Sequence, residues 1–168
     1  HWNCDSTRMP ATMHSFYLRN MYMKNLLRVP GGIKLAGVPI DLSKITVATY
    51  FVSAIEDHIA PWKSTFAGAT LFSGPVKFLL SKAGHIAGIV NPPGPRQYGY
   101  FTGPTSKGLS ADEWLAKATA HDVSWWSEWG EWIGAEGGDK VPARVPGAGR
   151  LAVIENAPGS YVSKRLSG

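Results

Sequence analysis

Two apolar runs on either side of one helical segment constrain the fold of this chain more than any other feature. Residues 47–53 read Val-Ala-Thr-Tyr-Phe-Val-Ser, the β-branched and aromatic pattern of a strand buried on both faces. Pro61 then opens a helix, where its missing N–H costs no hydrogen bond. Residues 76–80 form a second strand-like run. This order of strand, helix and strand predicts a right-handed parallel crossover and therefore an α/β fold.

Further elements are predicted on both sides of this unit. Apolar side chains recur at helical spacing from Thr12 to Arg28, so we expect one helix that ends before Pro30-Gly31-Gly32. Residues 33–35 and 38–40 predict a small hairpin. Residues 91–109 are rich in proline and glycine, which predicts a surface loop.

Two helices are predicted in the second half of the chain. Ser110 and Glu113 have the spacing of a capping box, which marks the start of a helix. Trp125, Trp129 and Trp132 recur at helical spacing in a segment that glycines end. These tryptophans could form an exposed contact surface for a partner, but their spacing is more typical of core packing. The exposed area of the rings distinguishes the two interpretations.

Charge and composition exclude some classes of function. The net charge is +5, from 17 basic and 12 acidic residues, but the basic residues are scattered and form no run interleaved with aromatic residues. Nucleic acid is therefore not an expected partner, and the charge does not decide between the remaining classes of function. The single cysteine, Cys4, allows no internal disulfide, which suits a reducing compartment.

The start of the chain and its apolar stretches bear on its place in a larger protein. No stretch approaches the roughly 18 apolar residues that a membrane helix needs. The chain begins at His1 without the pattern of a signal peptide, and we interpret this start as a cut inside a larger domain.

Asp57 and His85 are the residues best placed for chemistry. Each lies in the turn after a predicted parallel strand, and ligands bind at the carboxyl ends of such strands. A carboxylate next to an imidazole is the acid–histidine half of a nucleophile–acid–histidine triad, and the order acid then histidine is that of α/β-hydrolases. The simpler alternative is that Asp57 caps a turn or helix and His85 belongs to an ordinary loop.

Motifs around both residues resemble a known enzyme family. Residues 56–62 read Glu-Asp-His-Ile-Ala-Pro-Trp, and residues 84–93 read Gly-His-Ile-Ala-Gly-Ile-Val-Asn-Pro-Pro. They are similar to the acid and histidine motifs of poly(3-hydroxyalkanoate) synthases. The resemblance runs from residue 2 to about residue 164 and is closest to the class I enzymes. Further matching segments are residues 2–5, 17–19, 22–25, 124–126 and 157–162.

The resemblance implies the C-terminal part of an α/β-hydrolase fold with an incomplete sheet. Residues 1–43 would then be the end of a cap or insertion region, with one helix and a hairpin. Residues 44–138 would be the C-terminal part of the catalytic core, and residues 139–168 an extended tail. Because parallel strands need neighbours, we expect the isolated chain to expose an apolar strand edge and to be unstable or to aggregate.

The resemblance also implies roles for single residues. Asp57 would be the catalytic aspartate, which either orients the histidine or activates the 3-hydroxyl group of the monomer. His85 would be the base that activates a cysteine thiol. The family carries that cysteine in a Gly-x-Cys-x-Gly motif, which this sequence lacks. Cys4 stands where the family has a small residue, so we do not expect it to be the nucleophile. Because the motif with the nucleophile is absent from this sequence, we expect the chain alone to be inactive.

Three further residues are candidates for the substrate path. His58, Trp2 and Asn25 match family positions near it, although each could equally be a packing, capping or solvent-facing residue. Glu56, Asp57 and His58 are adjacent and lack the spacing of metal ligands, so no metal is expected.

The expected activity is polymerisation of (R)-3-hydroxyacyl-CoA, above all 3-hydroxybutyryl-CoA, into a polyester with release of CoA. The resemblance implies no cofactor, a homodimer, and a location in the cytoplasm at the surface of polymer granules. Two alternatives stay open. One is an esterase or depolymerase with the same fold, and the other is a non-catalytic paralogue that binds granules.

Overall fold

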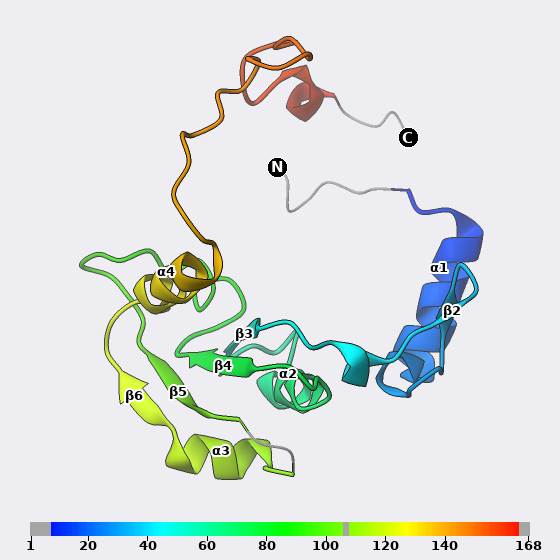
Figure 1. Ribbon diagram of the computed structural model, residues 1–168, viewed down its shortest axis with the longest axis vertical. Coiled ribbons are helices and arrows are strands. Elements are labelled where there is room, and N and C mark those ends of the chain that lie inside the picture. The colour runs from blue at the N-terminus through cyan, green and yellow to red at the C-terminus, as the bar shows by residue number, and fades with distance from the viewer. Residues whose placement is uncertain (1–7, 106–107, 165–168) are drawn as a thin grey trace.

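A four-stranded mixed sheet forms the centre of the computed structural model, which describes residues 8–105 and 108–164. The strands lie in the order β3–β4–β5–β6. β3 and β4 are parallel, whereas β5 and β6 extend the sheet in antiparallel pairs. Figure 1 shows the four strands side by side. Their bounds are Thr49–Ala54, Val76–Ser81, Tyr100–Pro104 and Thr119–His121.

The predicted parallel strand–helix–strand unit is confirmed. Helix α2, Trp62–Ala69, connects β3 to β4, and Pro61 is its N-cap residue. The register of the two strands runs from Thr49 opposite Val76 to Ala54 opposite Ser81. The mixed sheet with its helices is compatible with the predicted α/β class.

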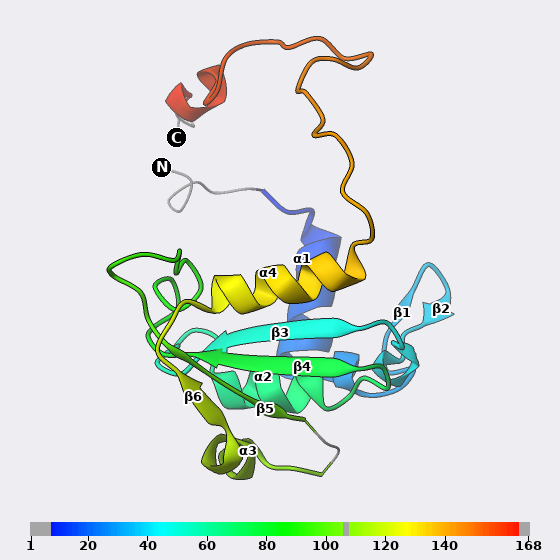
Figure 2. The same cartoon turned by 60° about the vertical axis from the view of Figure 1, so that its left-hand side comes forward.

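Helices cover both faces of the sheet because β4 is apolar on both sides. Phe78, Leu79 and Leu80 are fully buried. Phe78 faces α2 and helix α3, Ala111–Lys117, where it contacts the rings of Phe66 and Trp114 at centroid distances of 5.0 Å. Leu79 faces the opposite side, which helix α4, Trp125–Glu136, covers. Figure 2 shows α4 and α2 on opposite sides of β3 and β4.

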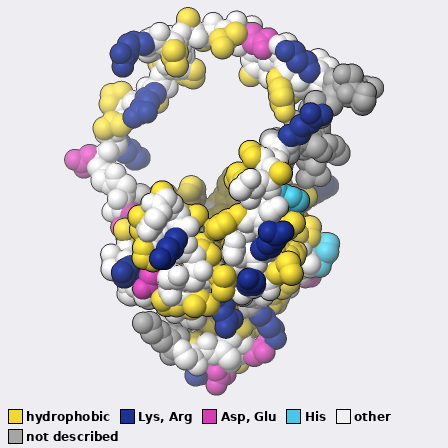
Figure 3. Space-filling model, turned by 90° about the vertical axis from the view of Figure 1, so that its right-hand side faces the viewer, with side chains coloured by type: hydrophobic (Ala, Val, Ile, Leu, Met, Phe, Trp, Pro, Cys, Tyr) yellow, Lys and Arg dark blue, Asp and Glu magenta, His cyan; other side chains and the backbone are white. Residues whose placement is uncertain are grey.

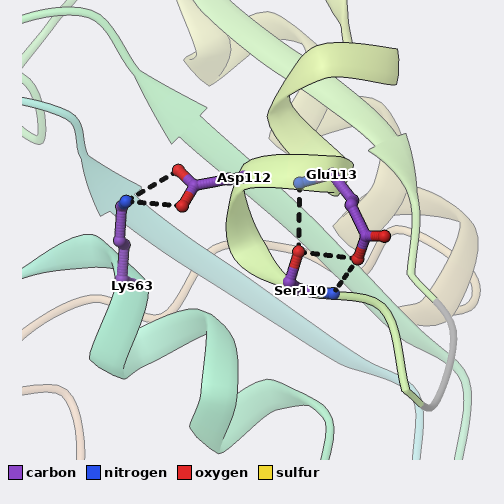
Figure 4. A network of polar contacts seen from close by, with 4 residues as sticks. All are labelled: Lys63, Ser110, Asp112 and Glu113. Atoms are coloured by element: carbon purple, nitrogen blue, oxygen red, sulfur yellow. Dashed lines mark hydrogen bonds and ion pairs between the residues drawn. The ribbon is translucent and has the colours of Figure 1, made fainter.

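The predicted capping box is present at the start of α3. Ser110 accepts a hydrogen bond from the backbone N–H of Glu113, and the Glu113 carboxylate accepts from the backbone N–H of Ser110. Asp112, which directly precedes Glu113, forms an exposed ion pair with Lys63 of α2 at 2.7 Å (Figure 4). The first turn of α3 is thus fixed by its own cap and linked to α2.

The prediction of a surface loop over residues 91–109 is wrong in part. Tyr100–Pro104 forms β5, which pairs along its whole length with β4. Its strand-like core is only Tyr100-Phe101-Thr102, and the flanking Gly99 and Gly103 hide it in the sequence. The short strand β6 was also not predicted.

The single helix predicted from Thr12 to Arg28 is wrong in its second half. Helix α1 covers Ala11–Tyr17 and continues as a π-helical turn, Leu18–Met23. Asn25 has a φ of +49°, in the left-handed region, and this residue separates the π-helical turn from a 3₁₀ turn, Leu26–Arg28. A left-handed residue cannot continue a right-handed helix, so the helix ends there.

The predicted hairpin is confirmed as β1, Lys34–Leu35, paired with β2, Val38–Pro39. A 3₁₀ turn, Leu42–Lys44, follows it before β3 begins. Within the described ranges, no helix combines the length and apolar character needed to cross a bilayer.

Residues 139–164 contain no regular element except a 3₁₀ turn, Ser160–Ser163. Figure 1 shows this segment arching away from the sheet, and Figure 3 shows the same arch with its side chains. Most of its apolar side chains are exposed, among them Val141, Leu151 and Ile154. The division of the chain into segments 1–43, 44–138 and 139–168 stays a prediction.

Candidate active site

β3 and β4 end at the same edge of the sheet, and their backbones stay paired beyond it. Ala54 lies opposite Ser81 at the last position of the ladder. The N–H of Ile55 then donates to the carbonyl of Ser81 at 2.9 Å, and the N–H of Glu56 donates to the carbonyl of Ala83 at 3.0 Å. The segments that follow β3 and β4 therefore leave the sheet side by side, which brings residues 57 and 85 close together.

The side chains of Asp57 and His85 meet at this edge. Asp57 Oδ2 lies 2.8 Å from His85 Nδ1. The Asp57 side chain is only 7% exposed, whereas that of His85 is 44% exposed. The other oxygen, Oδ1, accepts hydrogen bonds from the backbone N–H groups of Ile59 at 2.8 Å and Ala60 at 2.9 Å. The structure thus brings together the two residues that the sequence singled out.

The charge of Asp57 determines how the imidazole is oriented. Burial alone would raise the pKa of this carboxyl group, but the hydrogen bonds from Ala60, His85 and Ile59 outweigh it and hold the pKa at about 2. An ionised carboxylate can only accept hydrogen bonds, so His85 Nδ1 carries the hydrogen. The lone pair of the neutral ring is then on Nε2, which leaves that nitrogen available to take a proton.

His85 lies in a tight turn, residues 84–90, which we call the histidine loop. Its backbone folds back on itself through hydrogen bonds from Gly88 N–H to the Gly84 carbonyl at 2.9 Å and from Val90 N–H to the Ile86 carbonyl at 2.8 Å. A Cβ atom on Gly88 would lie 2.7 Å from the Cβ of Ala54. Only glycine therefore lets the histidine loop pack this closely against the end of β3.

The N-terminal end of α4 also contacts the histidine loop, which packs against the end of β3. The indole N–H groups of Trp125 and Trp126 donate to the carbonyls of Gly88 and Ile89, each at 3.0 Å. Sequence reasoning did not predict these contacts, because they join residues 37 positions apart. The only signal was the match of residues 124–126 to a known family.

Comparisons with known proteins agree with the motifs around this site. No family model matches the chain. A poly(3-hydroxyalkanoate) polymerase of Methylorubrum extorquens is 47% identical over 163 residues, which cover 96% of this chain and 27% of that protein. Polymerase subunits named PhaC from Rhizobium meliloti and Cupriavidus necator are 48% and 40% identical, over 98% of this chain and 26% and 28% of theirs. This chain belongs to the poly(3-hydroxyalkanoate) polymerase family.

The family resemblance predicted from the sequence is therefore confirmed. The chain spans about a quarter of the length of the poly(3-hydroxyalkanoate) polymerases that it matches. Asp57 and His85 therefore lie in a stretch that aligns with about a quarter of each of these polymerases.

The other predicted site residues have no such geometry. His58 follows Asp57 and is exposed, and it makes no hydrogen bond to another described residue. Asn25 lies at the break after the π-helical turn, and no hydrogen bond links it to Asp57 or His85. Trp2 and Cys4 lie outside the described residues. The roles of these residues in the polymerase family stay predictions.

The tryptophans of α4 fit neither interpretation alone. Trp125 is 8% exposed and packs against Leu79, as expected of a core residue, whereas Trp126 is 38% and Trp129 42% exposed. Together with the histidine loop they leave an open apolar groove of about 350 Å³. Its lining residues are Ile89, Val90, Trp125, Trp126 and Trp129.

Metal ligands do not gather in the part of the chain that the structure describes. Within residues 8–105 and 108–164, no three side chains of histidine, cysteine, aspartate or glutamate lie in an arrangement that could hold a metal ion. The chemistry that the described residues offer is that of an oriented imidazole.

Proposed function

We propose that this chain is the C-terminal part of a class I poly(3-hydroxyalkanoate) polymerase and supplies the acid and the base of its acyl-transfer site. The observation that carries the proposal is the 2.8 Å contact between Asp57 and His85 at the carboxyl ends of two parallel strands. The nucleophile would be a cysteine in a Gly-x-Cys-x-Gly motif outside this chain. The chain alone would then be inactive, in an α/β-hydrolase fold that the rest of the polymerase completes.

In the proposed reaction, His85 Nε2 takes the proton of the cysteine thiol. The thiolate attacks the thioester carbonyl of (R)-3-hydroxyacyl-CoA, and CoA leaves as a thiol once the imidazolium returns the proton. The acyl group is then on the cysteine as a new thioester. The hydroxyl group of the next unit gives its proton to His85 and attacks that thioester, which forms the ester bond of the polymer and breaks the bond between the acyl carbon and the cysteine sulfur. The cysteine leaves as a thiolate and takes the proton back from the His85 imidazolium.

The contacts of Asp57 favour one of its two expected roles. Both carboxylate oxygens are in use, Oδ1 by the backbone N–H groups of Ile59 and Ala60 and Oδ2 by His85. This arrangement supports an aspartate that orients the imidazole and stabilises its positive charge, rather than one that binds the substrate hydroxyl group.

The remaining features of the proposal follow from membership of the family. The substrate is 3-hydroxybutyryl-CoA, the product is a polyester, and no cofactor takes part. The complete enzyme is a homodimer at the surface of cytoplasmic polymer granules. The names of the relatives favour a polymerase over an esterase, a depolymerase or a non-catalytic granule-binding paralogue.

A chimeric enzyme tests the proposal. The segment of the Methylorubrum extorquens polymerase that matches this chain is replaced by residues 1–168, and CoA release from 3-hydroxybutyryl-CoA is measured. His85→Ala and Asp57→Asn should each lower kcat by about 1,000-fold or more, as the loss of triad members does in other enzymes. The control Asp112→Asn, which removes an exposed carboxylate of α3, should keep the activity.

Cys4→Ser separates the two possible sources of the thiol. The variant should polymerise as fast as the parent chimera, because the nucleophile is supplied by the other part of the enzyme. Full activity of His85→Ala would contradict the proposal, and so would a loss of activity in Cys4→Ser as large as that in His85→Ala.

A further inference from the structure

The backbone of the histidine loop depends on donors from α4. Within the loop, the carbonyls of Gly84 and Ile86 accept from backbone N–H groups of the same turn. The carbonyls of Gly88 and Ile89 have no such partner in the turn and accept instead from the indoles of Trp125 and Trp126. An indole N–H is a single donor on a rigid ring, so each bond fixes the position of one carbonyl.

A third contact extends this attachment by two residues. The hydroxyl group of Ser124, the N-cap of α4, donates to the carbonyl of Asn91, and both residues are 1% exposed. The Asn91 side chain in turn bonds the backbone of Tyr98 through its amide nitrogen at 2.7 Å and its oxygen at 2.9 Å. The chain that leaves the histidine loop is therefore held at three carbonyls by one end of one helix.

Helix α4 is itself fixed to the sheet. The Trp132 ring lies 5.1 Å from the ring of Tyr50 on β3. Glu128 accepts a hydrogen bond from the Tyr50 hydroxyl group and forms an ion pair with Lys77 on β4. These contacts involve the same two strands that position Asp57 and His85, so the strands and the helix place the histidine loop from both sides.

We propose that Trp125 and Trp126 are positioning residues for His85. Their indole N–H groups fix the backbone of the histidine loop in the position from which the imidazole contacts Asp57. In this position Nε2 faces the thiol of the proposed nucleophile. This inference rests on the proposed function, because it assigns the two tryptophans to the same acyl-transfer site. It gives them a role through hydrogen bonds to the loop backbone, distinct from contact with a polymer surface.

The test compares two matched substitutions in the chimeric enzyme. Trp126→Phe removes the N–H that holds Ile89, whereas Trp129→Phe removes the N–H of a ring with similar exposure that makes no hydrogen bond to another described residue. Both rings line the apolar groove, so a loss of groove packing affects both variants alike. Trp126→Phe should lower kcat by about 10- to 100-fold with little change in KM, as expected when a catalytic group is displaced. Trp129→Phe should keep kcat within about 2-fold.

A double substitution separates positioning from general destabilisation. If Trp126 acts through the Asp57–His85 pair, Asp57→Asn combined with Trp126→Phe should be no slower than Asp57→Asn alone. A purely structural tryptophan would lower the activity of both backgrounds by the same factor. Trp125→Phe, which leaves the buried Gly88 carbonyl without its donor, should show the same non-additivity.

The outcomes distinguish this inference from the proposed function. Equal kcat values for Trp126→Phe and Trp129→Phe, with His85→Ala inactive, would overturn the positioning role and leave the proposed function standing. Additive losses in the double variant would do the same. An active His85→Ala chimera would remove the proposed function and this inference with it.

Discussion

Asp57 and His85 lie 2.8 Å apart because the strands before them are parallel and end opposite each other, at Ala54 and Ser81. Backbone pairing then continues to Glu56 and Ala83, which leaves each side chain one or two residues from the last paired position. The Asp57 carboxylate is buried, and both of its oxygens accept hydrogen bonds, whereas the His85 imidazole is partly exposed. This difference in environment is the one that the proposed function requires, with an acid that orients the ring and a base that reacts.

Replacing Asp57 with asparagine should reduce the loss of unfolding free energy that the chain shows between pH 4 and pH 2. The folded-state pKa of about 2 is below the ordinary value of 3.8, so the unfolded chain binds the proton more tightly. The stability that the carboxylate contributes is complete above about pH 4 and is lost as the pH falls toward 2. Urea unfolding of the chain between pH 2 and 5, at concentrations where it sediments as a monomer, measures the difference.

The control for this measurement is Asp112→Asn, which removes a carboxylate from an exposed ion pair. It should keep the parental loss of stability between pH 4 and 2. An Asp57→Asn variant that loses as much stability over that range as the parent chain would contradict the linkage.

Gly88→Ala should destabilise the chain and displace His85. The added methyl group would lie 2.7 Å from the Cβ of Ala54 and 2.9 Å from the carbonyl oxygen of Gly84, so the histidine loop must shift. Such overpacking costs about 1–3 kcal/mol. Gly134→Ala is the matched control, because this glycine of α4 has open space around its Cβ position. It should stabilise the helix by about 0.5–1 kcal/mol, and equal effects of the two substitutions would refute the packing argument.

Ser110→Ala should destabilise α3 more than removal of the neighbouring ion pair does. The serine side chain caps the helix and belongs to a reciprocal capping box, and its loss costs about 1 kcal/mol. Lys63→Met breaks the ion pair with Asp112, whose side chains are 58% and 73% exposed, and should cost less than about 1 kcal/mol. Urea unfolding midpoints of the two variants give the order, and the reverse order would count against the cap.

Amide exchange should alternate along β3, because the structure pairs this strand with β4 alone among the described residues. The N–H groups of Thr49 and Ile55 point to β4, so those of Phe51 and Ser53 do too, and those of Tyr50 and Val52 face the open edge. In the isolated chain, Tyr50 and Val52 should exchange much faster than Phe51 and Ser53. In the chimera all four should be protected if a further strand joins this edge, and fast exchange there would argue against a larger sheet.

The sequence predicted the elements whose signals are local and strong. β3 and β4 were found because each is a nearly continuous apolar run, and α3 because Ser110 and Glu113 have capping-box spacing. The break at Asn25 was missed, since nothing in the spacing of its apolar neighbours indicates a left-handed residue. β5 was missed because its three strand-like residues lie between glycines, and only pairing with β4 makes them a strand.

In the candidate site, too, only the features with a strong signal in the sequence could be predicted. The approach of Asp57 and His85 could be predicted because parallel strands end at one edge, whatever the details of packing. The hydrogen bonds from Trp125 and Trp126 could not, because helical spacing indicates only which residues share a face of α4. It does not indicate which loop that face meets.

The single crossover that joins Asp57 to His85 also has an evolutionary consequence. Both residues, the helix α2 and strand β4 between them, and the start of α4 lie within residues 47–133, so a recombination breakpoint inside that block would separate partners that must fit each other. Breakpoints outside it would transfer the acid, the base and their supporting helix as one inherited unit.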